Sequence, residues 1–341
     1  MKRLKILTWV MLLAGLAVLT GLIAWQGVGE VSDTIARGGW PMLLLAFFFV
    51  PQCAIFAASW RLLFPPGREP GFVRAFGAMT VGIYANSLLP LADMGGEIIK
   101  ARIVMKGGVS GADAGASVVL DKTIQTITLV CWAIIGLLTL LALKVAGPAI
   151  YGGAIAVALL TLGTAGFIVV QHKGMFGGMA GAAERMTGGE SWARIAGGAR
   201  ELDRAVRDLY RNRGRLAAAS AIRLLGRFVL VGEIWLAAQL IGQPIGVLEA
   251  LALRSLGLSI RSAAFLVPGG YGIQEGGYVA IGALIGIPPD TALVLSLATR
   301  IRDLVVGVPA LAAWQWREGR ALRRDRPAVK SETSRATDGD A

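Results

Sequence analysis

Two stretches of this sequence place a carboxylate beside a helix break in apolar surroundings. One reads NSLLPLADMGGEIIK and the other reads FLVPGGYGIQEGGYV. Pro90 precedes Glu97 by the same interval as Pro268 precedes Glu275. Proline ends a helix and glycine adopts dihedral angles that other residues avoid, so each stretch predicts a broken helix. The N–H groups at such helix ends carry partial positive charge, which suits the binding of an anion.

The two stretches belong to a longer pattern that repeats with a constant offset along the chain. A basic residue follows each carboxylate at the same interval, and a further polar residue comes one helical turn later. Because breakers, carboxylates and basic positions share one offset, we predict an internal structural repeat. The matched pairs are Pro90 and Pro268, Glu97 and Glu275, Lys122 and Arg300, Gln125 and Asp303, and Gly108 and Gly286.

The charged members of this repeat have two compatible interpretations. In the first, Glu97 pairs with Lys122 and Glu275 pairs with Arg300, so that each ion pair attaches a broken helix to the helix after it. In the second, these charges line a polar cavity. A charge at the centre of a bilayer costs about 3 kcal/mol on insertion scales, so a partner or a wet cavity is expected for each.

Other charged residues in apolar segments extend the candidate site. Arg223 and Arg227 lie one helical turn apart on a predicted helix. Arg254 and Arg261 either face the protein interior or extend toward the membrane interface. The residues that we assign to a substrate-binding or translocation cavity are Asn86, Pro90, Gly95, Gly96, Glu97, Lys122, Gln125, Arg223, Arg227, Pro268, Gly269, Gly270, Gln274, Glu275, Arg300 and Asp303.

No set of residues predicts catalysis. Serine, lysine and aspartate are present, but not in the arrangement of a nucleophile elbow or a catalytic triad. The sequence has no Walker A motif, and its one histidine and two cysteines are not spaced as metal ligands. We therefore expect the protein not to be an enzyme and to use no cofactor and no metal.

The elements that position these residues belong in a membrane. The chain has 341 residues, of which 55% are hydrophobic and only 16% charged, and its mean hydropathy is +0.63. A soluble protein carries more charge, about a quarter of its residues. The formal net charge of +12 would suit nucleic-acid binding, but the basic residues fall mainly in loops and in the C-terminal tail. We therefore expect no nucleic-acid partner.

We predict an all-α integral membrane protein with six spanning helices and two re-entrant hairpins that are broken by proline and glycine. Each predicted span covers the roughly 20 residues that the hydrocarbon core of a bilayer requires. The spans are 6–25, 40–60, 114–143, 149–170, 216–241 and 290–314, and the hairpins are 72–106 and 246–287.

The distribution of basic residues predicts the orientation, because cytoplasmic loops are enriched in lysine and arginine. It places both termini in the cytoplasm, together with the loop 171–215, which is rich in arginine. An amphipathic helix is predicted over 192–213, in contact with solvent or with lipid headgroups. Both ends of the first hairpin then lie on the cytoplasmic side, and its second end carries Lys100, Arg102 and Lys106.

Three crossings separate the two copies of the repeat, so the second copy is predicted to be inverted in the membrane. Inverted repeats with broken helices near the midplane are typical of secondary transporters. The polytopic transmembrane domain is predicted over 1–316, with repeat halves at about 72–143 and 246–316. Residues 317–341 are polar, and we expect them to form a disordered cytoplasmic tail.

The sequence resembles a known family of membrane proteins. The stretches NSLLPLADMGGEIIKARIVMKGG, VVLDKTIQ and FLVPGGYGIQEGGYV resemble the lysylphosphatidylglycerol synthase transmembrane-region family of flippase-like proteins. The stretches AWQGVGEV, SLGLSIRSAAFLVPGG and LAAWQWREGRAL are further similar to its hopanoid-associated subgroup. The resemblance implies lipid translocation or handling at the bacterial inner membrane. It does not imply synthase activity, because we expect this chain to lack the soluble domain that attaches the amino acid.

From these features we expect an inner-membrane lipid transporter or flippase that moves hopanoid-type lipids or another phospholipid. Its partners would be membrane lipids with an anionic or polar headgroup. The alternative is a non-transporting membrane partner of a lipid-modifying enzyme or glycosyltransferase, bound through the loop 171–215. A lipid-biosynthesis protein is the expected protein partner, and no oligomeric state follows from the sequence.

Overall fold

The computed structural model describes residues 36, 38–89, 95–172, 190–264, 267 and 270–324. This part of the chain folds into helices and contains no strand, which agrees with the predicted all-α class. The predicted first span, 6–25, lies outside the described residues, and so does the tail beyond Arg324. Orientation and insertion of the N-terminal segment therefore stay predictions.

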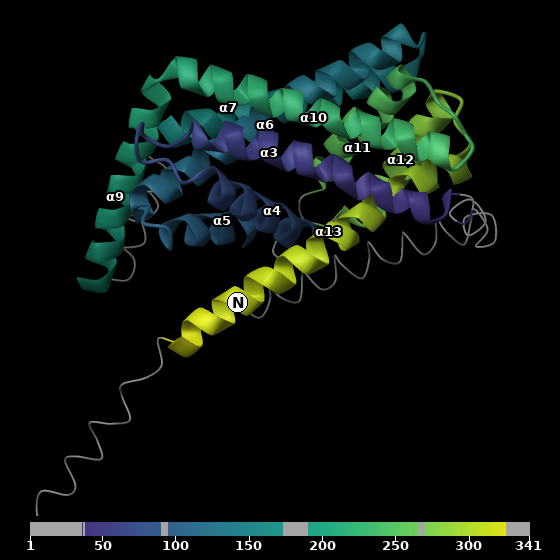
Figure 1. The fold of residues 1–341 in the computed structure, drawn as a ribbon. Coiled ribbons are helices and arrows are strands. Elements are labelled where there is room, and N and C mark those ends of the chain that lie inside the picture. The colour runs from purple at the N-terminus through teal and green to yellow at the C-terminus, as the bar shows by residue number, and fades with distance from the viewer. Residues whose placement is uncertain are drawn as a thin grey trace, which may run out of the picture.

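The helices occupy the segments that the sequence predicts, within a few residues at most ends (Figure 1). In chain order they are η1 (Trp40–Phe48), α3 (Phe49–Arg61), α4 (Phe72–Leu88), α5 (Gly95–Met105), α6 (Gly111–Ala142), α7 (Pro148–His172), α9 (Glu190–Arg211), α10 (Arg213–Leu240), α11 (Val247–Ala263), α12 (Ile273–Leu284) and α13 (Pro289–Arg324).

Three helical segments of the described chain are long and apolar enough to cross a membrane, namely 40–61, 111–142 and 148–171. The first consists of η1 and α3, and the other two are α6 and α7. α10 and α13 are also long enough, with 28 and 36 residues, but they carry charges along their buried faces. The full count of six spans therefore stays a prediction.

α4 and α5 form an antiparallel hairpin whose two ends lie together. Arg74 Nη1, near the start of α4, donates a hydrogen bond of 2.9 Å to the carbonyl oxygen of Gly107, just after α5. At the break, the backbone N–H of Gly96 donates to Asn86 Oδ1 at 2.7 Å. A Cβ atom on Gly96 would lie only 2.0 Å from the carbonyl oxygen of Gly82. Glycine is therefore required for the close approach of these two helices.

The helix boundaries agree with the internal repeat. The starts of α5 and α12 are separated by the same offset as Glu97 and Glu275, and so are the starts of α6 and α13. Gly108 and Gly286 share this offset, and both adopt positive φ angles, 92° and 77°, in the link before the third helix of their copy. Each copy thus consists of two short helices and a long one: α4, α5 and α6 in the first, and α11, α12 and α13 in the second.

The two copies pack against each other reciprocally. α4 of the first copy packs against α13 of the second, and α11 of the second copy packs against α6 of the first. A twofold relation between the copies produces such an exchange of partners. α10 packs against α3, α6 and α11 and completes the bundle (Figure 1).

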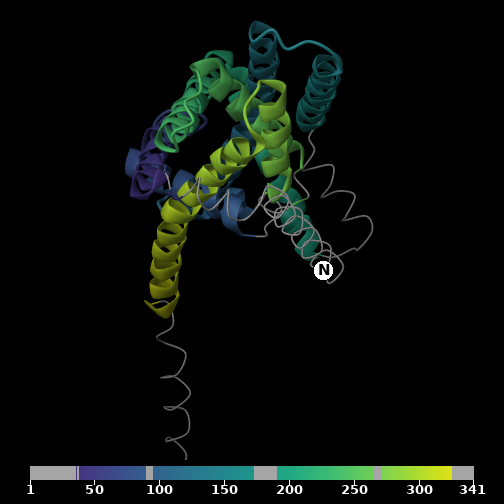
Figure 2. The ribbon, with the colours of Figure 1, turned by 90° about the vertical axis from the view of Figure 1, so that its right-hand side faces the viewer.

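The bundle is apolar on its outside as well as in its core. One buried cluster is centred on α3, α4 and α6, and the other on α10 to α13. Large apolar side chains also face outward, among them Leu159 and Leu162 of α7 and Val308 of α13. α7 lies at the margin of the bundle against α6, and few of its side chains are buried (Figure 2). This outer surface suits contact with lipid chains.

Two segments differ from their predicted form. α13 continues to Arg324, past the predicted end at 314, so residues 317–324 are helical and not disordered (Figure 1). α9 is the predicted amphipathic helix, but it also packs against α6. Its Tyr210 hydroxyl donates to Gln171 Oε1 at 2.7 Å, and its Val206 is buried in the core. This helix is therefore part of the bundle.

Candidate functional site

A cavity of about 400 Å³ lies between the two copies of the repeat, beside α3 and α10. Its wall takes side chains from α4, α5 and α6 of the first copy and from α11 and α13 of the second. Half of the residues that the sequence assigns to a cavity line this wall. They are Asn86, Glu97, Lys122, Gln125, Arg223, Arg227, Gly270 and Asp303.

The other candidates lie away from the wall or outside the described residues. The described ones that do not line the cavity are Gly95, Gly96, Gln274, Glu275 and Arg300. The ones outside the described residues are Pro90, Pro268 and Gly269.

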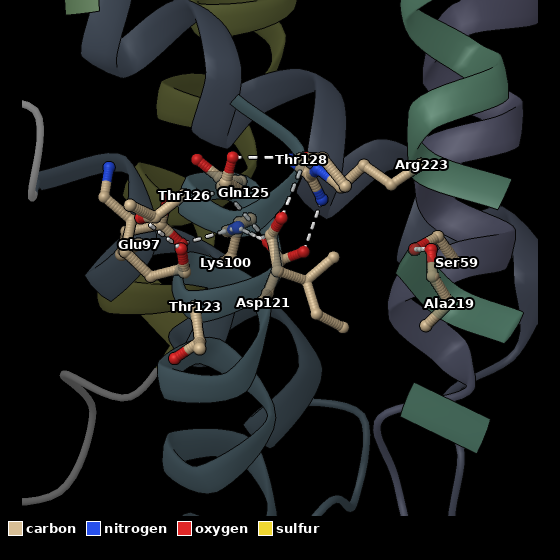
Figure 3. A network of polar contacts seen from close by, with 12 residues as sticks. Ser59, Glu97, Lys100, Asp121, Thr123, Gln125, Thr126, Thr128, Ala219 and Arg223 are labelled. Carbon is tan, nitrogen blue, oxygen red and sulfur yellow. Dashed lines mark hydrogen bonds and ion pairs between the residues drawn. The ribbon is translucent and has the colours of Figure 1, made fainter. Parts of the chain in front are cut away.

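An ion-pair network centred on Lys100 joins three helices at this wall (Figure 3). Lys100 Nζ lies 2.5 Å from Glu97 Oε2 and 2.6 Å from Asp121 Oδ2. The other carboxylate oxygen of Asp121 pairs with Arg223, which reaches across from α10. Lys100 is 2% exposed and Asp121 is 0% exposed, so these charges depend on one another for compensation.

Aromatic rings lie against the two cations of this network. Lys100 Nζ is 5.4 Å from the centroid of the Trp60 ring, and the guanidinium carbon of Arg223 is 4.4 Å from the centroid of the Phe56 ring. The negative face of an aromatic ring attracts a cation, and this attraction increases where water is excluded. α3, which carries both rings, thus helps to fix the positions of the charges.

Gln125 extends the network to the cavity. Its Nε2 donates to Asp121 Oδ2 at 3.1 Å and lies 3.5 Å from Glu97 Oε1. Its backbone carbonyl oxygen accepts a hydrogen bond of 3.0 Å from Arg227 Nη2. Lys122 lines the same cavity, and its predicted pair with Glu97 stays a prediction.

A second chain of contacts links α10, α13, α11 and α4. Arg302 donates from Nη1 to Glu233 Oε2 at 2.5 Å and from Nη2 to Asp303 Oδ1 at 2.7 Å. Asp303 Oδ2 lies 3.7 Å from Arg261 Nη1, and Arg261 Nη2 donates to Ser87 Oγ at 3.0 Å. The charges of the second copy therefore reach a hydroxyl of the first copy across the cavity wall.

The predicted ion pair between Glu275 and Arg300 is present, and it closes the second break. Arg300 Nε donates to Glu275 Oε1 at 2.9 Å, and Arg300 Nη2 donates to the carbonyl oxygen of Gly270 at 3.3 Å. Glu275 Oε2 accepts the backbone N–H of Gly272 at 2.7 Å and caps the start of α12. These contacts hold the break against α13, which favours the structural interpretation of this pair.

Comparison with known proteins agrees with the helical membrane architecture. Residues 12–310 match the lysylphosphatidylglycerol synthase TM region family. The chain belongs to this family. It is also similar to a UPF0104 membrane protein of Pyrococcus horikoshii, with 22% identity over 322 residues that cover 89% of this chain and 94% of that protein. No solved structure matches the chain. The family resemblance and the membrane location are thus confirmed, whereas the hopanoid-associated subgroup stays a prediction.

In this member of the lysylphosphatidylglycerol synthase TM region family, one expectation about a basic residue is wrong. The sequence predicts Lys100 at the cytoplasmic end of the first hairpin, but Lys100 is buried because it faces inward from α5, one turn after Glu97. For Arg254 and Arg261 the structure decides between the two alternatives. Both line the cavity, which agrees with the first alternative, that they face the protein interior.

Several functional residues were missing from the candidate set, although five of them are charges inside apolar segments, where a partner or a wet cavity is expected. Lys100 lies one helical turn after Glu97, so a helical α5 places both on one face. Arg302 and Glu233 are 69 residues apart, and no spacing rule links them. The residues that the structure adds to the site are Lys100, Asp121, Glu233, Arg254, Arg261 and Arg302.

The wall can bind a polar or anionic group through hydrogen bonds and ion pairs. Its polar atoms are guanidinium and ammonium groups, carboxylates, side-chain amides and hydroxyls. Within the ranges that the structure describes, no cluster of histidine, cysteine and acidic side chains could hold a metal ion. The chemistry available to this wall is therefore recognition of a polar group next to an apolar outer surface.

Proposed function

We propose that this protein is a lipid transporter of the bacterial inner membrane, which moves a lipid headgroup through the cavity between its two repeat halves. The observation that carries the proposal is a polar, cationic cavity inside a bundle whose outside is apolar. A lipid has the same division between a polar head and apolar chains. The candidate cargo is a hopanoid-type lipid or another phospholipid, in keeping with a family named for a lipid synthase.

Helix lengths support a re-entrant arrangement of both hairpins. α5 has 11 residues and α12 has 12, which correspond to lengths of about 17 and 18 Å. Both are shorter than the hydrocarbon core of a bilayer, which is about 30 Å thick. We therefore propose six spans and two re-entrant hairpins, with the second copy inverted and both termini in the cytoplasm. A headgroup would enter between the hairpins while the chains stay in lipid.

A flipping assay on reconstituted protein tests this proposal. Vesicles carry a trace of phospholipid with a fluorophore on one acyl chain, and dithionite quenches only the fluorophores of the outer leaflet. We expect dithionite to quench nearly all fluorescence in proteoliposomes but only the outer-leaflet fraction in vesicles without protein. Quenching limited to the outer leaflet for every lipid tested, hopanoids included, would contradict transport.

A cavity-filling variant makes the assay specific. Thr126 lines the cavity on α6, whereas Leu138 is 57% exposed on the outer face of the same helix. We expect Thr126→Trp to slow flipping strongly because the indole group occupies the cavity, and Leu138→Trp to leave the rate unchanged. If both variants fold and flip lipid at the same rate, the cavity is not part of the transport path.

The alternative function is that of a non-transporting partner for a lipid-modifying enzyme or glycosyltransferase. One observation favours it: the outward face of α9 is charged, with Arg204, Arg207, Asp208 and Arg211 all exposed. Replacing these residues with alanine tests a docking role. Loss of cellular function and of an associated lipid-biosynthesis enzyme in pull-downs, combined with no flipping by the wild type, would favour this alternative over transport.

A further inference from the structure

The described cavity wall carries more positive than negative charge. Seven cationic side chains line it, against two carboxylates, those of Glu97 and Asp303. Two more carboxylates, Asp121 and Glu233, lie behind the wall and pair with lining arginines. Seven cations against these four carboxylates amount to an excess of three positive charges. The cations are Lys100, Lys122, Arg223, Arg227, Arg254, Arg261 and Arg302.

One part of this excess charge is at Arg227. Its Nη2 donates to the carbonyl oxygen of Gln125 at 3.0 Å and to Thr128 Oγ1 at 3.1 Å, and both acceptors are neutral. No carboxylate among the described residues lies within 4.0 Å of this guanidinium group. Two further arginines, Arg223 and Arg254, act unfavourably on its charge.

A second part of the excess charge is at Arg254, on the neighbouring helix α11. This side chain is 7% exposed, lines the same cavity and lies beside the neutral phenol of Tyr278. Glu233 acts on it from beyond ion-pair distance, but Arg302 already binds that carboxylate. In the part of the chain that the structure describes, Arg254 has no carboxylate within 4.0 Å.

Arg227 and Arg254 line the same cavity, and the charge of Arg254 acts unfavourably on that of Arg227. Two guanidinium groups in one low-dielectric wall lose hydration and repel each other, so a counter-charge is favourable there. The planar guanidinium fork matches two oxygens of a phosphate. A neutral polyol headgroup would leave this repulsion in place, and a zwitterionic headgroup would bring a compensating cation of its own. A phosphate with net negative charge would remove the repulsion.

We infer that Arg227 and Arg254 bind the phosphate of an anionic lipid headgroup, so that the cavity selects anionic phospholipids over zwitterionic and neutral lipids. This inference rests on the proposed transport function and narrows its cargo. Both arginines line the cavity, and the helices that carry them, α10 and α11, pack against each other and against α6. The cavity volume of about 400 Å³ lies in the usual range for small-ligand sites.

Flipping of two acyl-labelled lipids, phosphatidylglycerol and phosphatidylcholine, tests the selectivity. We expect the wild type to move phosphatidylglycerol at least tenfold faster, which corresponds to about 1.4 kcal/mol. The double variant R227Q/R254Q should lose this preference by slowing the anionic lipid alone. R227K/R254K keeps both charges and should retain part of the preference. The matched control R68Q/K144Q removes two exposed charges that do not line the cavity and should behave as the wild type.

The outcomes separate this inference from the transport proposal. Equal rates for both lipids in the wild type would overturn the inference and leave transport intact, and so would an unchanged preference in folded R227Q/R254Q. If the double variant does not elute as a folded protein, the two single glutamine variants take its place. If no lipid is flipped, native mass spectrometry with dioctanoyl phosphatidylglycerol and phosphatidylcholine decides. Preferential binding of the anionic lipid, lost in R227Q/R254Q, supports the inference, and equal binding overturns it.

Discussion

At the residue scale, Asp121 connects three helices through two buried ion pairs. It lies on α6 and binds Lys100 of α5 with one carboxylate oxygen and Arg223 of α10 with the other. Desolvation of each ion is costly, and only the mutual attraction of the three compensates for it. Asp121 therefore fixes the first hairpin and α10 relative to each other, and it positions one wall of the cavity.

We expect Asp121→Asn to lower the free energy of unfolding by about 3–5 kcal/mol, the usual cost of removing one partner from a buried ion pair. The amide keeps the volume of the side chain but no longer balances Lys100 and Arg223. Thermal unfolding of detergent-purified protein measures the change. Asp208→Asn on the exposed side of α9 is the control and should not alter the melting temperature. Equal stability of both variants would contradict a central role for Asp121.

At the scale of elements, the break of each hairpin depends on contacts to backbone groups. In the first copy the N–H of Gly96 binds Asn86, and the carbonyl oxygen of Gly82 occupies the space that a Cβ atom of residue 96 would need. In the second copy the carboxylate of Glu275 binds the N–H of Gly272, and Arg300 attaches the break to α13. The two copies thus solve the same problem, free backbone groups at membrane depth, with different residues.

We expect Gly96→Ala to destabilise the protein by about 1–3 kcal/mol, as overpacking does in a close-packed core. The added methyl group would lie 2.0 Å from the carbonyl oxygen of Gly82, so α4 and α5 must move apart. Gly77→Ala on α4 is the matched control, because a Cβ atom there meets no atom within 4 Å. Thermal unfolding should show a loss for the first variant and none for the second. Identical melting curves would show that the helices separate without cost.

α13 reaches the end of the first hairpin through Glu318. Its Oε1 accepts a hydrogen bond of 2.5 Å from Arg102 Nη2, and its Oε2 accepts one of 2.7 Å from Lys106 Nζ. The hydrogen bond from Lys106, with that from Arg102, lowers the pKa of Glu318 from its ordinary value of 4.5. These contacts place the C-terminal part of α13 and the end of the first hairpin on one side of the bundle, as the predicted orientation requires.

The lowered pKa of Glu318 predicts a pH-dependent contribution to stability. Since the folded-state pKa lies below 4.5, the ion pairs stabilise the fold above that pH, and the contribution is lost as the pH falls through the folded-state pKa. Partly exposed pairs contribute about 0.2–1 kcal/mol, so Glu318→Gln should lower the melting temperature slightly near pH 7. The difference from the wild type should vanish at acidic pH, below the folded-state pKa. Glu201→Gln, exposed on α9, is the control, and a difference that persists in acid would refute the ion-pair explanation.

At the scale of the whole molecule, the reciprocal packing of the two copies creates the cavity. The first helix of each copy packs against the long helix of the other copy, so the cavity lies where the copies meet. In transporters built from inverted repeats, one repeat moves against the other around a fixed site. The proposed inversion of the second copy would then expose the cavity to the two sides of the membrane in turn.

Cysteine labelling tests this arrangement directly. In a cysteine-free background, Arg68→Cys and Ser110→Cys flank the first hairpin, and Gln243→Cys and Pro288→Cys flank the second. An impermeant maleimide should label the first pair from the cytoplasmic side and the second pair from the outer side. Labelling of the two members of one pair from opposite sides would mean that this hairpin crosses the membrane fully.

Several properties of this protein follow from its sequence alone, because they are local. The length of the apolar runs predicted the membrane class and the helical segments, and proline with glycine predicted both breaks. The constant offset between matched positions related the two copies and identified the pair of Glu275 and Arg300, which the structure contains. Half of the candidate residues line the cavity for a related reason: charges in apolar helices turn inward.

Only the tertiary structure decided which charges meet. Asp121 and Arg223 are 102 residues apart, and Arg302 and Glu233 are 69 apart, so no spacing in the chain relates them. Their contact depends on the rotation of each helix about its axis and on the helices that lie beside it, and packing of the whole bundle sets both. The same packing leaves Arg227 without a carboxylate within ion-pair distance among the described residues, and two arginines, Arg223 of the same helix and Arg254 of α11, act on its charge.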